Sequence, residues 1–336
     1  MKTFGVCAAQ SVIAVFFLVS LCGTGRVTAQ TATTIPVGFI KVTLPAAPSA
    51  SQPSNTVISV PLYTNADFSG MVATVDGTNT LSLTGAAWTA SQFVSSPHLV
   101  RFKSGTLSGR FYLITANTTS QLTIDMRGAS LTGVVATSDN CEVLPSNTLA
   151  TLFGSTSTTL QTASTAGAAD NVVIWNGASW DTFYHNGTNW KKTGSLLNQN
   201  NTILYPDEGI FMIHRPTSQL DIVFTGTCPS TQEQTDLVGA GSTFMANRFP
   251  VDMQLSTAGI HLSANWVTGT TANAADNVFI WNGTNWDTYY HNGTNWKKSG
   301  SLLNQNTTAI PTGAAVFVTR SNAAASTLTQ SLPYTF

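Results

Sequence analysis

Charged side chains are scarce in this sequence. Lys, Arg, Asp and Glu make up 9% of its 336 residues, against roughly 25% in an average soluble domain. The largest basic clusters are the pairs Lys191-Lys192 and Lys297-Lys298. Nucleic acids and anionic lipid surfaces are held by many Lys and Arg side chains acting together. The composition therefore argues against both kinds of partner, and uncharged polar residues must keep the chain soluble.

Long apolar runs are also missing after the first 30 residues. No later segment approaches the roughly 18 consecutive apolar residues of a membrane-spanning helix. The start of the chain is different, because Lys2 precedes an apolar run at residues 4–22, and the small-residue site Val27-Thr28-Ala29 follows it. This pattern is typical of a secretory signal peptide, so we expect residues 1–29 to be removed before Gln30 and the protein to be secreted or displayed at the cell surface. A membrane anchor is the alternative, but Arg26 ends the run as a cleavage region does.

Cysteine is rare. The sequence contains four cysteines, and Cys7 and Cys22 would leave with the signal peptide. Two remaining cysteines in an exported chain most simply form one disulfide, so we predict a bridge between Cys141 and Cys228, with two free thiols as the alternative. Such a bridge would stabilise the fold by roughly 3–4 kcal/mol if it were unstrained.

Motifs of the common catalytic and cofactor sites are missing as well. The sequence has no Ser nucleophile elbow, no histidines at metal-ligand spacing and no Gly-rich phosphate loop. The paired carboxylate Asp207-Glu208 is flanked by Pro206 and Gly209, which is typical of an exposed turn. We therefore predict no catalytic residue, no metal and no cofactor, and a hydrolase assembled from distant residues is an alternative.

The sequence does contain a long internal repeat. The segment at 168–200 is repeated at 274–306, with identical residues at 28 of the 33 aligned positions and a constant offset of 106. Turn signals at short intervals between β-branched segments favour strands, and Asp76-Gly77 in MVATVDGTNTLSLTG predicts a β-hairpin. The sequence therefore predicts an all-β fold of two tandem, related β-sandwich-like units. We place unit A at residues 30–229 with an inserted small β subdomain at about 68–145, a linker at 230–241, and unit B at 242–336.

The repeated segment reads as a β-meander rich in aromatic residues. Its Asn-Gly pairs are typical of type I′ hairpin turns, in which both central residues have positive φ. A four-residue loop at 282–285 would set Trp281 opposite Trp286, but a two-residue loop would not, and the sequence leaves this open. The aromatic residues are either core or an exposed platform that stacks on sugar rings. The candidate ligand-binding residues of such a platform are Trp190, Trp296, Tyr184, Tyr290, His185 and His291.

Several motifs resemble an uncharacterised family of exported repeat proteins found in Verrucomicrobia and their relatives. They are IPVGFIKVTLPA (35–46), ATLFG (150–154), AADNVVIWNG (168–177), YPDEG (205–209) and LPYT (332–335). Unit B is also similar, more weakly, to β-modules of secreted Bacteroidetes proteins. These resemblances imply an exported, all-β, non-catalytic protein of the surface or matrix.

The leading hypothesis from the sequence is a structural or adhesive module of the cell surface or extracellular matrix, with surface or matrix components as partners. The alternative is a polysaccharide-binding protein that uses the duplicated Trp and Tyr hairpins. An outer-membrane barrel is a further alternative, suggested by the closing segment LTQSLPYTF. However, the continuously apolar segments VVIW and VFIW lack the alternation of barrel strands.

Overall fold

The computed structural model describes residues 36–49 and 51–335, and these residues are almost entirely strands and loops. The all-β prediction is confirmed. The predicted signal peptide at residues 1–29 lies outside the described residues.

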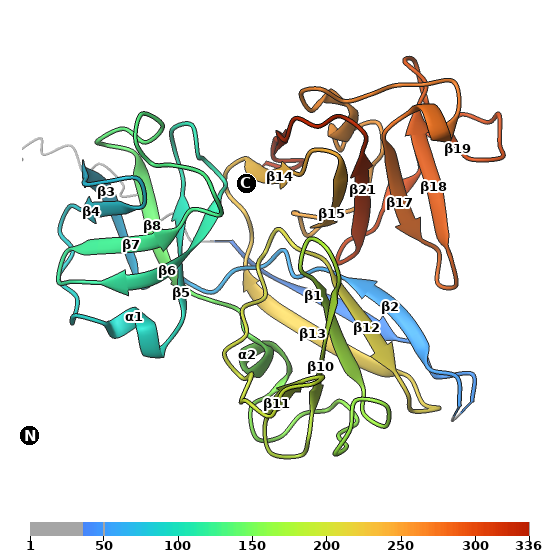
Figure 1. The fold of residues 1–336 in the computed structure, drawn as a ribbon, viewed down its shortest axis with the longest axis horizontal. Coiled ribbons are helices and arrows are strands. Elements are labelled where there is room, and N and C mark those ends of the chain that lie inside the picture. Colours follow the sequence, from blue (N-terminus) through green and yellow to red (C-terminus); the bar gives the residue numbers. More distant parts are fainter. Residues whose placement is uncertain (1–35, 50, 336) are drawn as a thin grey trace, which may run out of the picture. The chain divides into compact units, whose positions relative to one another are not determined.

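Unit A contains a five-stranded antiparallel sheet of order β11-β10-β9-β12-β2 and a two-stranded sheet of β1 and β13 (Figure 1). The elements are β1 (Val37–Leu44), β2 (Ser54–Ile58), α2 (Leu149–Phe153), β9 (Asn171–Trp175), β10 (Trp180–His185), β11 (Trp190–Lys192), β12 (Ile210–His214) and β13 (Leu220–Thr227). Alternate side chains of β1, such as Ile40 and Val42, pack with Val172 and Phe183 of the larger sheet. The two sheets of unit A therefore share one hydrophobic core.

Unit B has a five-stranded sheet of order β15-β21-β17-β18-β19, and β14 pairs with β22. This order is the same as in unit A when each strand is replaced by its counterpart in the aligned sequence. The elements are β14 (Glu233–Leu237), β15 (Gly241–Ala246), β16 (Met253–Gln254), η1 (Ile260–Leu262), η2 (Ala272–Ala274), β17 (Asn277–Trp281), β18 (Trp286–His291), β19 (Trp296–Lys298), β20 (Ala309–Ile310), β21 (Ala315–Arg320) and β22 (Ser326–Gln330).

The predicted linker at residues 230–241 is wrong for its central part. Residues 233–237 form β14, which runs antiparallel to β22. Although this segment is polar, four of its five residues are buried, and only Asp236 is exposed. Because β14 pairs with a strand of unit B, it belongs to that unit.

The inserted segment of unit A forms a closed barrel of order β3-β4-β7-β6-β5-β8. The strands are β3 (Phe68–Val75), β4 (Thr80–Leu83), β5 (His98–Phe102), β6 (Phe111–Asn117), β7 (Gln121–Asp125) and β8 (Asn140–Pro145), and a short helix α1 (Gln92–Ser95) precedes β5. The hairpin expected around Asp76-Gly77 is the β3–β4 pair. Phe102, Leu122 and Val143 are among the buried residues that fill the barrel.

The predicted disulfide between Cys141 and Cys228 is wrong, because both thiols are free. Cys141 lies in β8 and is buried in the barrel core. Cys228 follows β13 and packs against the separate core of unit A. Because each cysteine belongs to a different core, packing holds the two side chains apart.

The Asn-Gly turns also differ from the predicted type I′ geometry. Gly177 has φ of 95°, but no Asn of these pairs has positive φ. Instead, the Asn176 side-chain oxygen accepts hydrogen bonds from the backbone N–H groups of Ala178 (3.1 Å) and Ser179 (2.8 Å). The asparagine is selected here as a side-chain acceptor, and only the glycine is selected for its backbone freedom.

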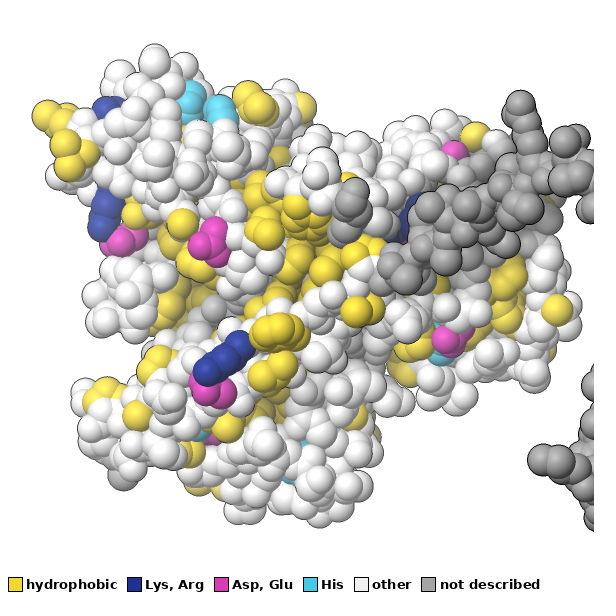
Figure 2. Space-filling view, turned by 180° about the vertical axis from the view of Figure 1, so that it is seen from behind, with side chains coloured by type: hydrophobic (Ala, Val, Ile, Leu, Met, Phe, Trp, Pro, Cys, Tyr) yellow, Lys and Arg dark blue, Asp and Glu magenta, His cyan; other side chains and the backbone are white. Residues whose placement is uncertain are grey.

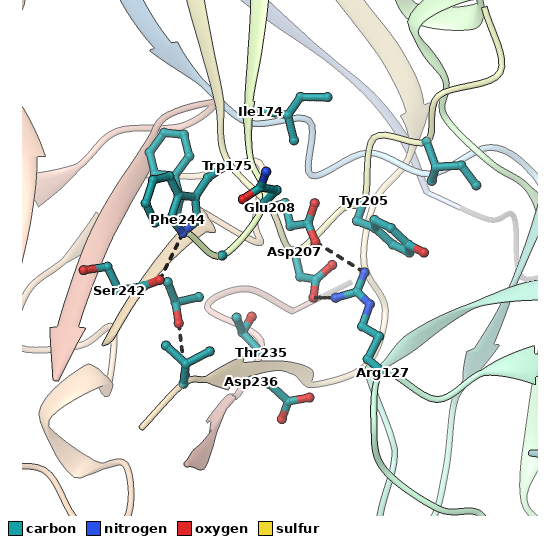
Figure 3. A pocket seen from close by; sticks show the side chains of 15 residues that line it. Arg127, Ile174, Trp175, Tyr205, Asp207, Glu208, Thr235, Asp236, Ser242 and Phe244 are labelled. Carbon is teal, nitrogen blue, oxygen red and sulfur yellow. Dashed lines mark hydrogen bonds and ion pairs between the residues drawn. The ribbon is translucent and has the colours of Figure 1, made fainter. Parts of the chain in front are cut away.

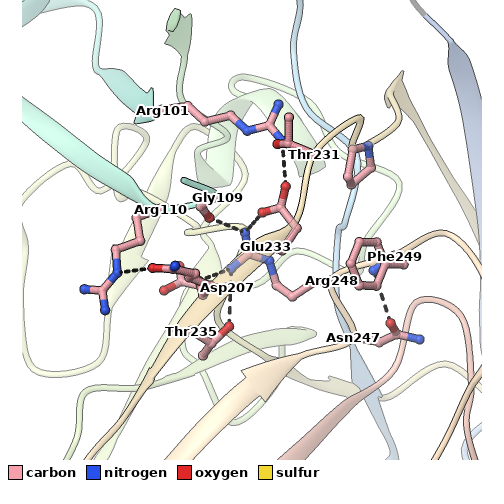
Figure 4. A network of polar contacts seen from close by, with 12 residues as sticks. Arg101, Gly109, Arg110, Asp207, Thr231, Glu233, Thr235, Asn247, Arg248 and Phe249 are labelled. Atoms are coloured by element: carbon pink, nitrogen blue, oxygen red, sulfur yellow. Dashed lines mark hydrogen bonds and ion pairs between the residues drawn. The ribbon is translucent and has the colours of Figure 1, made fainter. Parts of the chain in front are cut away.

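A buried network of ion pairs connects the barrel with unit B (Figure 4). Arg101 of β5 donates to Glu233 of β14 at 2.6 Å, and Arg248 donates to the second oxygen of the same carboxylate. Arg248 also donates to the backbone oxygens of Gln234 (3.0 Å) and Gly109 (3.3 Å). All three ionised side chains are buried.

Two further arginines of the barrel reach acids of the rest of the chain. Arg110 lies 2.7 Å from Asp236 of β14, and Arg127 lies 3.0 Å from Asp207 of unit A. In these two ion pairs and in the pair Arg101–Glu233, the cation lies on the barrel and the carboxylate lies outside it. Charge complementarity therefore orients the barrel against units A and B.

Candidate functional site

The predicted aromatic platform is wrong, because its tryptophans are core residues. Trp190 and Trp296 are 0% and 1% exposed. Trp190 lies in the short edge strand β11 and packs against Phe153 and His185. Its indole N–H donates to the backbone oxygen of Gly154 at 2.7 Å. A ring enclosed in this way cannot stack on a sugar.

The other residues of the predicted platform are also largely enclosed. His185, Tyr290 and His291 are buried, and Tyr184 is half-buried. The Tyr290 hydroxyl donates to the backbone oxygen of Thr270 at 3.3 Å, and the His291 ring stacks on His261. These side chains fasten loops to the sheet rather than face solvent.

A second set of tryptophans lies where units A and B meet. Trp175 is opposite Trp180 and Trp281 is opposite Trp286, so each connecting loop has four residues. Their rings contact three phenylalanines, which are Phe211, Phe244 and Phe317. In each unit, one face of the large sheet packs on the unit's own core. The other face therefore contacts the other unit.

The contacts between the two units are reciprocal. The Trp175 indole donates to the backbone oxygen of Ser242 in unit B (3.1 Å), and the Trp281 indole donates to that of Asn55 in unit A (3.3 Å). Asn55 and Ser242 occupy equivalent positions in the aligned sequence. A Cβ atom at Gly209 would lie 2.5 Å from the Cβ of Ala315, so this position needs glycine for close approach of the two units.

An aromatic cavity of about 400 Å³ opens at this meeting of the units. It is here called the junction groove, and it is lined by Trp175, Trp180, Ser242, Phe279, Trp286, Phe317 and Thr319. Trp180 is 40% exposed. The Ser242 and Thr319 hydroxyls lie 2.7 Å apart. No charged side chain lines the groove, and charged side chains are few and scattered over the face of the molecule drawn in Figure 2.

A second cavity of about 410 Å³ adjoins the junction groove and shares Trp175 and Ser242 with it. We call it the Arg127 pocket (Figure 3). The Arg127 guanidinium lies 3.0 Å from Asp207 and 3.5 Å from Glu208. It also lies 3.7 Å from the centre of the Tyr205 ring, within the range of a cation–π contact.

The Arg127 pocket holds one carboxyl group with a shifted pKa. Burial is the main cause that raises the pKa of Glu208 from its ordinary value of 4.5 to about 7; Arg127 opposes the rise, and the neighbouring Asp207 contributes to it. One oxygen of Asp207 is buried without a hydrogen-bond partner in the described part of the chain. A perturbed carboxyl group in a cavity is a common mark of a functional site.

The free energy of unfolding should depend on pH because of Glu208. Between pH of about 4.5 and about 7 the folded chain keeps a proton on Glu208 that the unfolded chain has released, so stability falls as the pH rises through this range and then levels off. Because the side chain is 35% exposed, water screens the effect, and we expect about 1 kcal/mol. Urea unfolding of the wild type and of Glu208→Gln at about pH 5 and about pH 8 measures it. Equal pH dependence in both proteins would contradict this assignment.

This region could not be predicted from the sequence. Pro206 and Gly209 predict an exposed turn at Asp207-Glu208, but the Asp207 side chain is only 15% exposed and pairs with Arg127, 80 positions earlier. The sequence did contain one signal for the groove. A four-residue loop at 282–285, one of the two loop lengths that the sequence allows, sets Trp281 opposite Trp286.

Two further features bear on the chemistry of the described residues. Among them, no group of three or more His, Cys, Asp or Glu side chains could hold a metal ion. None of the helices described is long and apolar enough to cross a membrane.

No protein-family model, no curated protein and no solved structure matches this chain. The resemblance to exported repeat proteins therefore stays a prediction, and the site has to be interpreted from its own chemistry.

Proposed function

We propose that this chain is an exported, non-catalytic adhesive protein of the cell surface or extracellular matrix, and that it binds polysaccharide in the junction groove. The observation that carries the proposal is the set of partly exposed aromatic rings around an uncharged cavity. Flat indole rings suit the apolar faces of sugar rings, and nearby hydroxyls can exchange hydrogen bonds with sugar hydroxyls. An interaction surface of this kind is consistent with a chain that carries few charges.

The arrangement of carboxylates supports binding rather than hydrolysis. Asp207 and Glu208 both pair with the guanidinium of Arg127. A glycosidase instead places two carboxylates on either side of the bond that it cleaves. The pair in this pocket is positioned to contact a ligand from one side.

A purely structural role is the second candidate. It is favoured by the dense ring contacts between the units, because Trp180 packs against Phe211, Phe244 and Phe317. In that case the groove would be part of the connection between the units and would bind no ligand.

Affinity electrophoresis of the protein from Gln30 onward in a panel of soluble polysaccharides tests the proposal. We expect Trp180→Ala to weaken binding about tenfold or more, because an exposed aromatic anchor dominates such contacts. Phe39→Ala is the matched control, since it removes another exposed aromatic ring (72% exposed) outside the groove. Binding of no polysaccharide, or equal losses in the two variants, would leave the structural role as the better explanation.

A further inference from the structure

The Arg127 pocket is lined by more carboxyl groups than guanidinium groups. Its lining includes one cation, Arg127, and three carboxyl groups, which belong to Asp207, Glu208 and Asp236. Asp236 pairs with Arg110 at 2.7 Å, and Asp207 is also attracted by the buried Arg248. Glu208 is therefore the least compensated of the three, with Arg127 3.5 Å away.

The hydrogen bonds in the pocket leave some of its carboxylate acceptors unused. Carboxylates only accept hydrogen bonds, and each can accept several. One Asp207 oxygen is buried and has no donor among the described residues. Glu208 meets Arg127 at 3.5 Å, which is longer than a strong charged hydrogen bond. The pocket is therefore complementary to a group that is positively charged and donates several hydrogen bonds.

The pKa of Glu208 agrees with this picture. Burial raises this pKa to about 7, because removal from water disfavours the charged form, and Arg127 offsets only part of the rise. A cation bound beside it would supply the missing compensation.

The pocket and the junction groove are neighbouring cavities. Trp175 and Ser242 line both of them, and Figure 3 shows Trp175 and Phe244 on the side of the pocket opposite Arg127. A chain of several sugar rings is long enough to contact the rings of the groove and the carboxyl groups of the pocket together.

We propose that the Arg127 pocket binds the ammonium group of an amino sugar whose neighbouring rings lie in the junction groove. This inference rests on the proposed function, because it names the class of polysaccharide that the groove receives. Asp207 and Glu208 accept hydrogen bonds from the ammonium group, and Arg127 holds both carboxylates in place from the other side. An N-acetylated sugar has the same ring but no positive charge, so it makes only the contacts of the groove.

Isothermal titration calorimetry with three soluble hexasaccharides tests the inference. The probes are the hexamers of glucose, of N-acetylglucosamine and of glucosamine. We expect the glucosamine hexamer to bind about tenfold to a hundredfold more tightly than the other two, the range for a hydrogen bond to a charged group. Glu208→Gln and Asp207→Asn should each reduce the ratio of the affinity for the glucosamine hexamer to the affinities for the two neutral hexamers.

Controls separate the failure of the inference from that of the proposed function. Asp221→Asn removes a carboxylate of β13 that pairs with Lys41 outside the pocket, and it should preserve the preference. Equal affinities for all three hexamers, or a preference that survives both pocket variants, would overturn the amino-sugar assignment alone. If none of the hexamers binds the wild type, or if Trp180→Ala binds them as tightly as the wild type does, the proposed function fails together with the inference.

Discussion

Replacing Glu233 with Ala is expected to lower the free energy of unfolding by about 3–5 kcal/mol, the usual cost of breaking a buried ion pair by removing one partner. Glu233 and Arg248 are fully buried and Arg101 is 2% exposed. The carboxylate accepts hydrogen bonds from both guanidinium groups. Without it, Arg248 would keep only neutral oxygen acceptors, from Gln234, Gly109 and Thr235.

Chemical unfolding monitored by tryptophan fluorescence measures this loss. Asp221→Ala is the control, because it removes an ion pair with Lys41 in which both side chains are at least a third exposed, and exposed pairs contribute about 0–1 kcal/mol. If Glu233→Ala were no more destabilising than Asp221→Ala, the network would not hold the barrel to unit B.

This network explains how an inserted barrel can be part of one compact structure. The described residues belong to a single unit, although the barrel has its own closed core. Arg101, Arg110 and Arg127 come from three separate places in the barrel sequence, and their partners lie between Asp207 and Asp236. Such pairings are set by tertiary packing, so no local pattern in the sequence could reveal them.

The elements that were predicted correctly depend on local chemistry. Alternation of side chains and frequent turn residues indicated an all-β chain, and the Asp76-Gly77 hairpin was recognised from its turn. The four-residue loop that pairs Trp281 with Trp286 was one of two possibilities considered. Both depend on interactions within a few residues along the chain, which is why the sequence contains their signal.

The wrong predictions concern tertiary packing, that is, which face of a strand is buried and which core a residue belongs to. The alternation along β10 separates Asp181, Phe183 and His185 from Trp180, Thr182 and Tyr184, but it does not say which face is the core. The first face packs inside unit A, where Phe183 is buried, and the second carries Trp180 to the junction. The disulfide failed for a similar reason, since the spacing of two cysteines does not show that they belong to different cores.

The position of Trp190 in the core leads to the second large effect. Trp190→Ala is expected to lower the free energy of unfolding by about 3–5 kcal/mol, as is usual for truncating a buried Trp. Trp180→Ala should cost clearly less, because this ring is 40% exposed. Urea unfolding of the two variants under the same conditions makes the comparison.

A conservative pair of substitutions separates packing from hydrogen bonding. Trp190 donates to the Gly154 oxygen at 2.7 Å, whereas the equivalent indole of Trp296 has no hydrogen-bond partner in the described part of the chain. Trp190→Phe should therefore cost about 1 kcal/mol more than Trp296→Phe. If Trp190→Ala instead proved as stable as Trp180→Ala, Trp190 could not be a core residue, and the exposed platform would again compete with the junction groove as the sugar site.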